Sequence, residues 1–194
     1  MDQSFPYQAI TISGKIATGT TTLAKALSKI LQWDYLNAGD MQRTYDRQHH
    51  IHENKQGAQS RPDAHEQEID AHTKKILMEQ KNIIYEAWLS GFIAKEIPQV
   101  FKILVICSND AIRIDRVVNR ENIAVDKAKE WIRNREEENI KKWHQLYGNY
   151  DFWDPKYYDL VIDTYSSGRM ETVGKVLDKI GYTRLPHLTS LGKI

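Results

Sequence analysis

The sequence predicts an α/β fold in which helices cover both faces of a five-stranded parallel sheet, giving three layers. Strand-length apolar runs alternate along the chain with segments whose apolar residues recur at helical spacing, which is the order expected of repeated strand–helix units. Lys102 to Cys107 is almost wholly apolar, as expected of a central strand that is covered on both faces. The first strand, Ala9 to Ser13, runs directly into a glycine-bounded loop, and Leu23 and Leu27 mark the helix that follows.

Length and composition bound the domain organisation and the partners. The chain has 194 residues, with 27 Lys and Arg residues against 26 Asp and Glu residues. This length predicts one α/β domain, and the near-balance of charge provides no basic footprint for nucleic acid. Cys107 is the single cysteine, which suits a reducing cytoplasm. Because no apolar stretch approaches membrane-spanning length, we expect a cytoplasmic protein that binds neither nucleic acid nor a membrane.

The loop after the first strand has the spacing of a phosphate-binding loop. Gly14 and Gly19 enclose four residues and are followed by Thr20 and Thr21. In the P-loop pattern Thr20 occupies the position of the lysine, and Thr21 supplies the hydroxyl that binds magnesium. Backbone N–H groups and the positive end of the helix dipole converge on an anion in such a loop. The predicted phosphate-binding residues are Gly14, Lys15, Ile16, Ala17, Thr18, Gly19, Thr20, Thr21 and Thr22.

Lys15 offers a second lysine, one residue after the first glycine of the loop. Its ammonium group would reach the outer phosphates by folding back across the loop, a placement that resembles deviant Walker motifs. The alternative is an ordinary solvated loop lysine. Both interpretations stay open at this point.

The next segments are expected to form a strand and two helices. Trp33 to Asn37 is the predicted second strand, and a helix is expected from Met41 with Asp40 as its N-cap. The composition from Gln48 to Ala71 shifts to polar residues and histidines. A solvated insertion is favoured there over a metal site, because neither cysteine nor an H-E-x-x-H spacing accompanies the histidines.

A helix from Asp63 to Glu79 is predicted within and beyond this polar region. Its apolar side consists of Ile69, Thr73, Ile76 and Leu77. The side chains left to face a cleft are Glu66, Asp70 and Lys74.

Three more strands and a last helix complete the predicted sheet. Asn82 to Glu86 is the third strand and ends in a carboxylate, and Lys102 to Cys107 is the fourth. Tyr158 to Asp163 is the fifth, and the amphipathic segment Met170 to Ile180 is the closing helix.

An arginine-rich segment lies between the fourth and fifth strands. Asn109 or Asp110 caps a predicted helix, and a longer helix that starts near Asp126 ends at Gly148. The arginines of the first helix fall three or four residues apart and share one face. One interpretation is a solvated pair of helices whose glutamates pair with the arginines, and the other is a set of cations that closes over a bound polyphosphate. The residues concerned are Arg113, Arg116, Arg120, Arg133, Arg135, Glu136, Glu137 and Glu138.

The order of these motifs is distinctive. A P-loop is followed by a strand that runs into Asn-Ala-Gly-Asp-Met-Gln-Arg, an acidic helix with Glu-Ile-Asp, a strand ending in Glu, the arginine-rich hairpin and a late Tyr-Asp-Leu-Val-Ile-Asp-Thr strand. This order resembles the cytidylate kinase family, especially its short archaeal-type branch, over nearly the whole chain. The matching stretches are Ile10–Leu27, Leu36–Arg43, Glu68–Ala71, Ile83–Leu89, Arg113–Arg120, Arg133–Gly148 and Tyr158–Thr164.

The resemblance implies a three-layer P-loop NTPase fold of the nucleoside-monophosphate-kinase type. It implies one kinase domain over residues 1–185, with an acceptor-binding insertion over 38–80, a lid-like helical hairpin over 113–136 and a C-terminal tail over 186–194. The implied reaction moves the γ-phosphoryl group of ATP, with Mg²⁺, onto a small-molecule phosphate acceptor such as CMP or dCMP. A monomer or a weak homodimer is expected.

The resemblance also implies roles for individual residues. Thr21 would hold magnesium and Glu86 a metal-bound water, while Arg43 would bind the phosphate of the acceptor. Asp40 and Asp70 would lie near its sugar or base. The cations implied to act on ATP and on the transferring group are Lys15, Arg113, Arg116, Arg120, Arg133 and Arg135. Phosphoryl transfer requires mainly positioning and charge stabilisation of this kind from a protein.

Two positions depart from the family pattern. Thr20 replaces the usual lysine, although some members of this branch also read Gly-Thr-Thr. Glu86-Ala87-Trp88 stands where the family has an acidic residue, Gly and an Arg that binds the acceptor phosphate. Trp88 is expected either to stack on the acceptor or to fill the volume of the arginine. These departures keep an alternative function open, namely a catalytically impaired nucleotide-binding sensor or partner protein.

Overall fold

The sheet has the predicted strand number and direction. The computed structural model describes residues 6–52 and 57–183, so the predicted tail over 186–194 lies outside the described residues. All neighbouring strands are parallel, and their order is β2-β3-β1-β4-β5. The strands are β1 Ala9–Ser13, β2 Asp34–Asn37, β3 Ile83–Glu86, β4 Val100–Ile106 and β5 Leu160–Asp163.

The helices also follow the predicted order. The helix expected over Asp63–Glu79 has those bounds, and Asn109 caps the helix after β4 through a hydrogen bond from the N–H of Ala111 at 2.9 Å. The long helix ends at Gly148, as expected. The helices are α1 Thr20–Leu31, α2 Ala38–Gln48, α4 Asp63–Glu79, α5 Ser90–Ile93, α6 Asp110–Glu121, α7 Val125–Tyr147 and α8 Arg169–Lys179, with 3₁₀ turns η1 Gly57–Ser60 and η2 Pro155–Tyr157.

The expected cap of α2 is wrong. The helix begins at Ala38, three residues before the expected start, and Asn37 is its N-cap. The Asn37 side chain accepts a hydrogen bond from the N–H of Gly39 at 2.8 Å. Asp40 lies inside the first turn of α2, where a carboxylate still interacts favourably with the helix dipole.

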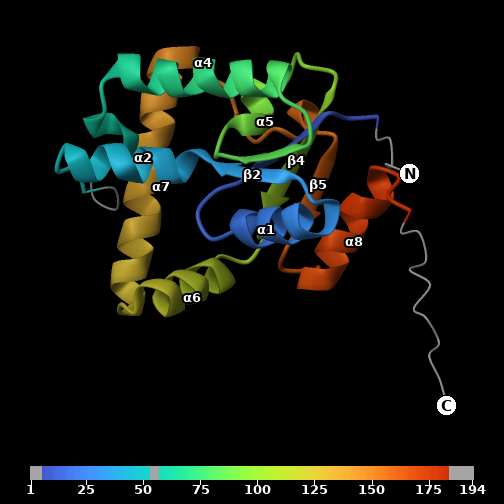
Figure 1. Cartoon of the computed structure of the whole chain (residues 1–194). Coiled ribbons are helices and arrows are strands. Elements are labelled where there is room, and N and C mark those ends of the chain that lie inside the picture. The colour runs from blue at the N-terminus through green and yellow to red at the C-terminus, as the bar shows by residue number, and fades with distance from the viewer. Residues whose placement is uncertain (1–5, 53–56, 184–194) are drawn as a thin grey trace.

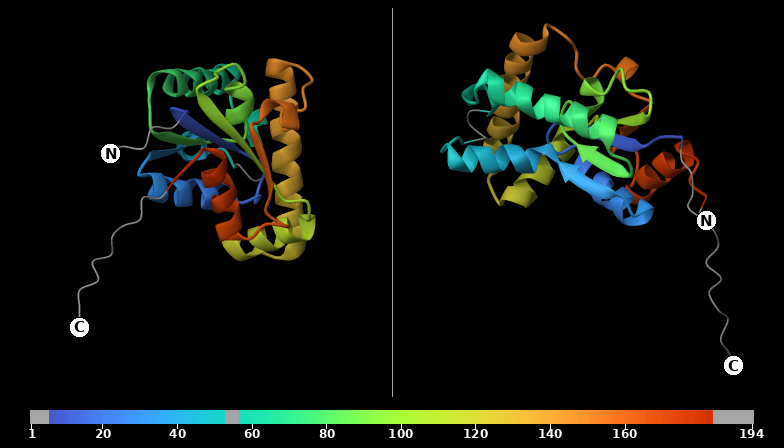
Figure 2. Two further views of the ribbon diagram at one scale, coloured as in Figure 1. Left: turned by 90° about the vertical axis from the view of Figure 1, so that its right-hand side faces the viewer. Right: turned by 45° about the horizontal axis from the view of Figure 1, so that its top comes forward.

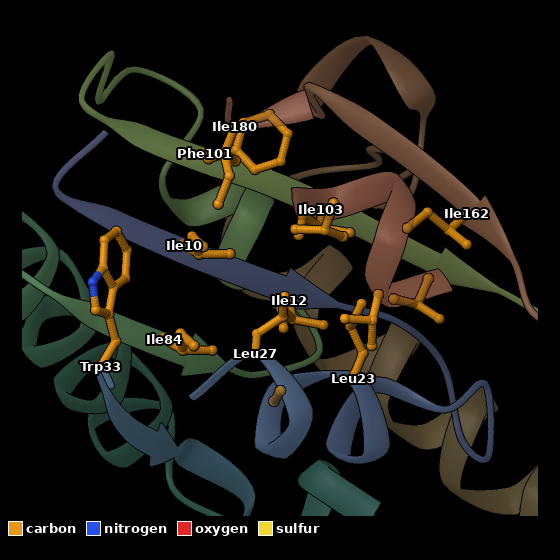
Figure 3. Close-up of a cluster of buried hydrophobic side chains, with 14 residues drawn as sticks. Ile10, Ile12, Leu23, Leu27, Trp33, Ile84, Phe101, Ile103, Ile162 and Ile180 are labelled. Atoms are coloured by element: carbon orange, nitrogen blue, oxygen red, sulfur yellow. The ribbon is translucent and has the colours of Figure 1, made fainter. Parts of the chain in front are cut away.

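Alternating residues of β1 pack on opposite faces of the sheet and define the layers. Ile10 and Ile12 belong to the larger core cluster, which α1 and α8 cover (Figure 3). Ala9 belongs to a second cluster with Ile76 and Leu77 of α4. Figure 1 shows α4 on one side of the sheet and α1 and α8 on the other, so helices cover both faces as a parallel sheet requires.

The parallel register brings the ends of three strands to one edge of the sheet. Ile12 of β1 and Asn37 of β2 both pair with Glu86 of β3. The strands β2 and β3, which follow β1 in the sequence, lie on one side of β1, and β4 and β5 lie on the other side. The strand order therefore reverses at β1, and ligands of open α/β sheets bind at such a switch point. The long helix α7 stands beside the sheet (Figure 2), and no helix in the part of the chain that the structure describes is long and apolar enough to cross a membrane.

Candidate active site

A cavity of about 530 Å³ opens at the carboxyl edge of the sheet. Its walls come from the loop after β1, from the residues that follow β2 and β3, and from α4 and α7. One part of the cavity therefore contains the predicted phosphate-binding loop, and the other contains the predicted acceptor residues.

The loop between β1 and α1 is held through its carbonyl groups. Arg113 Nε donates to the Ile16 carbonyl at 3.0 Å, and Arg116 Nη1 donates to the Ala17 carbonyl at 2.9 Å. Thr164 Oγ1 donates to the Thr18 carbonyl at 2.7 Å. Donors outside the loop thus occupy these carbonyls, which leaves the opposite, N–H side of the loop for an anion.

The backbone of this loop has the conformation of an anion-binding concavity. Ala17 has φ 59° and Gly19 has φ 105°, so left-handed residues alternate with Thr18 between them, and such alternation turns successive N–H groups inward. The N–H groups of the first turn of α1 lack intrahelical partners by geometry. Loop and helix together form a site for phosphate.

Glu86 is the centre of a hydrogen-bonded group at the tip of β3. The hydroxyls of Thr20 and Thr21 both donate to Glu86 Oε1 at 2.7 Å. Asn37 Nδ2 donates to Glu86 Oε2 at 3.1 Å, and the Tyr35 hydroxyl donates to the same oxygen. Burial, followed by the contact with Glu86, raises the pKa of Tyr35. Tyr35 therefore stays a neutral donor near neutral pH and fixes the carboxylate beside Thr21.

The two halves of the cavity meet at a group of tryptophans. Trp88 lines the cavity, and its ring centroid lies 5.6 Å from that of Trp143 and 6.2 Å from that of Trp153. Arg135 lies over the ring of Trp88, with its Cζ 5.7 Å from the centroid. Lys15 lies over the ring of Trp153, with its Nζ 4.9 Å from the centroid. Cations and aromatic faces at these distances attract each other.

The acceptor half of the cavity contains charged groups in two different environments. Arg43 and Asp40 form an ion pair at 2.6 Å, in which Asp40 is largely exposed and Arg43 is partly exposed. Arg61, by contrast, is 6% exposed and binds Asp46 through both carboxylate oxygens, at 2.8 and 2.6 Å. A bidentate pair of this kind fixes its partners, so Arg61 is a rigid part of the wall.

Glu66 is a buried carboxylate in the same wall. Trp143 Nε1 donates to its Oε2 at 3.2 Å, and Gln42 Nε2 donates to its Oε1 at 3.2 Å. Arg61 Nη1 lies 3.4 Å from Oε1. Four donors would saturate the two oxygens of one carboxylate, and the residues that the structure describes supply three, which leaves room for a donor from a ligand.

Asp70 lies one turn after Glu66 on α4, and its pKa is raised. Burial raises the pKa of Asp70 to about 6, although the hydrogen bond from the Tyr147 hydroxyl opposes the shift. Asp70 lines the cavity. As pH falls through about 6, the Asp70 carboxylate takes up a proton and can then donate a hydrogen bond as well as accept one.

The comparison of the chain with known families bears on this geometry. The sequence profile described as the cytidylate kinase-like family matches residues 9–166. The chain belongs to this family. Its loop, its Thr21–Glu86 pair and its arginine-rich helices all lie within the matched range.

Relatives of this cytidylate kinase-like protein include several proteins named cytidylate kinase. The one from Methanosarcina barkeri is 29% identical over 157 residues, which are 80% of this chain and 86% of that protein. The one from Pyrococcus abyssi is 33% identical over 159 residues, which are 80% of this chain and 83% of that protein.

Solved structures support the fold. An uncharacterized protein from Eubacterium ventriosum matches with a TM-score of 0.67 and 15% identity over 91% of this chain and 99% of that chain. A gluconokinase from Sinorhizobium meliloti matches with a TM-score of 0.59 and 10% identity over 92% and 94%. At such identities the likeness shows the fold alone. Family and fold together make this cytidylate kinase-like protein a kinase with a P-loop fold.

The cavity of this cytidylate kinase-like protein brings together most of the residues predicted from sequence. The loop, the strand ends, α4 and α7 each contribute. The predicted residues that line it are Gly14, Lys15, Ile16, Ala17, Thr20, Thr21, Asp40, Arg43, Asp70, Glu86, Trp88, Arg120 and Arg135. Glu66 and Asp70 face it as expected, whereas Lys74 lines a different cavity behind α4.

Other predicted residues lie around the cavity of this family member without lining it. Thr18 is 3% exposed and Gly19 caps α1, while Thr22 and Arg133 lie on exposed surfaces. Arg113 and Arg116 lie behind the loop. Arg113 pairs with Asp110 and Glu136, so the predicted pairing of arginines with glutamates is confirmed for this residue.

Several residues that line the cavity were not predicted from the sequence. Tyr35 and Asn37 had a usable signal, because a parallel sheet places the end of one strand beside the end of its neighbour. Asn139 and Trp143 follow Arg135 at helical spacing on α7 and so share its face. Arg61 had no signal, since it precedes Pro62 in a polar stretch without periodicity.

Proposed function

We propose that this kinase transfers the γ-phosphoryl group of ATP, with Mg²⁺, to a nucleoside monophosphate, with CMP or dCMP as the first candidate. The observation that carries the proposal is a single cavity with two halves. One half contains a phosphate-binding loop and the Thr21–Glu86 pair, and the other contains the cation Arg43. The name cytidylate kinase of the relatives supports the choice of CMP.

The donor half fits ATP and Mg²⁺. Thr21 Oγ1 and Glu86 Oε1 are 2.7 Å apart, and hydroxyl, carboxylate and water oxygens are the ligands that Mg²⁺ prefers. Thr21 would hold the ion and Glu86 one of its waters. Mg²⁺, when bound, neutralises charge on the phosphate oxygens. The loop N–H groups would orient the phosphate chain, and Asn37 and Tyr35 would keep Glu86 in place.

The acceptor half fits an anion attached to a ring. Arg43 would bind the phosphate of the acceptor. The phosphate can displace Asp40, the present partner of Arg43, because surface ion pairs are weak. Trp88 and Trp143 provide flat faces beside Glu66, a buried carboxylate that accepts hydrogen bonds. Arg120 and Arg135 would add positive charge between the two halves. Each of these residues binds or orients, which is what phosphoryl transfer requires.

A phosphoryl-transfer screen tests the function. The purified protein is mixed with ATP and Mg²⁺ and with each ribo- and deoxynucleoside monophosphate in turn. Turnover is expected with CMP or dCMP, and Glu86→Gln should lower kcat by about 100-fold or more because it loses the charge that holds metal-bound water. Lys29→Ala, an exposed change at the far end of α1, serves as the control and should leave kcat unchanged.

Other outcomes of the screen are equally informative. Turnover with a different monophosphate would keep the reaction and replace the acceptor. ATP binding without transfer to any acceptor would contradict the proposed function and leave a nucleotide-binding protein.

A further inference from the structure

Lys15 has an unusual environment for a cation in a phosphate-binding loop. Its Nζ lies 4.9 Å from the centroid of the Trp153 ring. Among the described residues, Lys15 has no carboxylate within ion-pair distance. Glu136 is near enough for Lys15 to lower its pKa, against the larger effect of burial, which raises it, but Glu136 binds Arg113.

The orientation of Trp153 is fixed from the other side. Its Nε1 donates to the backbone carbonyl of Trp88 at 3.2 Å, and Trp88 lies two residues after Glu86, the last residue of β3. The ring also packs against Trp143 and Phe152, with centroid distances of 6.2 Å in both cases. Trp153 is therefore a rigid platform on which the Lys15 side chain lies at the cavity wall.

An aromatic face suits this purpose because it attracts a cation without neutralising its charge. A carboxylate at the same place would compete with phosphate for Lys15, whereas the quadrupole of an indole ring holds the ammonium group and leaves its N–H donors available to phosphate. We infer that Trp153 is a positioning residue that holds Lys15 at the cavity wall, where Lys15 acts on the phosphates of ATP in place of the lysine that Thr20 replaces. This inference rests on the proposed function.

A comparison of two substitutions at one position tests the role of the ring. Trp153→Phe loses the hydrogen bond to the Trp88 carbonyl but keeps an aromatic face for Lys15, and Trp153→Leu loses both while keeping an apolar side chain. We expect Trp153→Leu to weaken ATP binding or lower kcat about three- to tenfold, and Trp153→Phe to stay within about twofold of the wild type. The acceptor KM should change less than the ATP affinity in both variants, because Lys15 acts on the donor and the ring touches the acceptor half, among the described residues, only through Trp88 and Trp143.

A double-variant cycle separates positioning from a general loss of structure. Trp153→Leu should have no further effect on ATP affinity or on kcat when Lys15→Ala is already present, since the ring then has no cation to hold. Urea midpoints of all variants show how far each remains folded. The control is Trp131→Leu, because Trp131 carries Lys127 at 6.0 Å from its centroid and neither residue lines the cavity.

The outcomes distinguish this inference from the proposed function. Equal losses for Trp153→Leu with and without Lys15, or a Trp153→Phe variant as impaired as Trp153→Leu, would overturn the inference while leaving the kinase intact. If the wild type transfers no phosphate but binds ATP, the same cycle is measured as ATP affinity by calorimetry, and the pattern above still supports the inference. A wild type that does not bind ATP contradicts both.

Discussion

Thr20 stands at the position of the P-loop lysine, and its contact with Glu86 shows how the neighbouring residues accommodate this difference. The side chain at the lysine position is a short hydroxyl that donates to Glu86 Oε1 at 2.7 Å. A long cation there would lie beside the same carboxylate and compensate its charge. With threonine, neutral donors hold Glu86, and under the inference above Lys15, at another wall of the cavity, takes the place of the missing cation.

Asp70 yields a prediction about pH. Burial raises the pKa of Asp70 from 3.8 to about 6, so the folded protein retains a proton that the unfolded chain releases near pH 4. The contribution of Asp70 to the free energy of unfolding therefore falls as pH rises from about 4 to about 6. Asp70→Asn lacks this titration, so relative to the wild type it should gain about 2–3 kcal/mol between pH 4 and pH 7.

Urea unfolding at several pH values measures this difference. Tyr147→Phe provides a companion test, because its hydroxyl bonds to Asp70 and lowers the pKa of that carboxyl. Without the hydroxyl, the midpoint of the titration should move to higher pH. A stability difference between Asp70→Asn and the wild type that stays constant with pH would refute the assignment.

At the scale of elements, the loop between β1 and α1 is constrained by close packing. A Cβ added to Gly14 would lie 2.5 Å from Thr18 Oγ1 and 2.5 Å from the carbonyl oxygen of Val105. The second contact is with backbone of β4, so the loop itself must move. Gly14→Ala should therefore reduce the free energy of unfolding by about 1–3 kcal/mol and weaken ATP binding at least tenfold.

Gly174→Ala is the matched control for this change. Gly174 lies inside α8, and a Cβ added there would have no neighbouring atom within 4 Å; alanine in a helix is favoured over glycine by about 0.5–1 kcal/mol. A small gain in stability and unchanged ATP affinity are expected. Unchanged ATP affinity in Gly14→Ala as well would mean that the loop does not bind the phosphates.

Elements could be predicted from the sequence where local patterns decide them. The helical periodicity of α4 gave its bounds, and the apolar run of β4 gave a central strand. The cap of α2 was wrong because Asn37 and Asp40 are both good N-caps, and the choice depends on where β2 ends. Arg113 and Arg116 showed their charge in the sequence but not their partners, which are loop carbonyls about a hundred residues away.

The same limit applied to Trp88. The sequence left stacking on the acceptor and packing as alternatives, and the structure shows a ring that packs against Trp143 while lining the cavity. The position of the Trp88 ring depends on Trp143 and Trp153, which lie far from it in the sequence. Only the tertiary arrangement shows it.

For the molecule as a whole, α7 connects the acceptor side to the rest of the fold. Asn139 Oδ1 accepts from the N–H of Ala58 at 2.6 Å, and Lys142 Nζ donates to the Arg61 carbonyl at 2.7 Å. Lys142 also pairs with Asp63 at the start of α4. The helix that carries Arg135 is thus attached to the segment that carries Arg61, and both arginines line the cavity.

Lys142 should therefore affect acceptor binding without touching the acceptor. It is 5% exposed, and Lys142→Met keeps the length of the side chain but removes both interactions, which should cost about 2–4 kcal/mol of unfolding free energy. The neighbouring exposed Lys141 gives the control Lys141→Met, expected within about 0.5 kcal/mol of the wild type. Below the melting temperature, the acceptor KM should rise severalfold in Lys142→Met while the ATP KM stays nearly constant, because the donor loop is held separately by Arg113 and Arg116. Equal increases in the two KM values would instead mean that α7 supports the whole cavity as one unit.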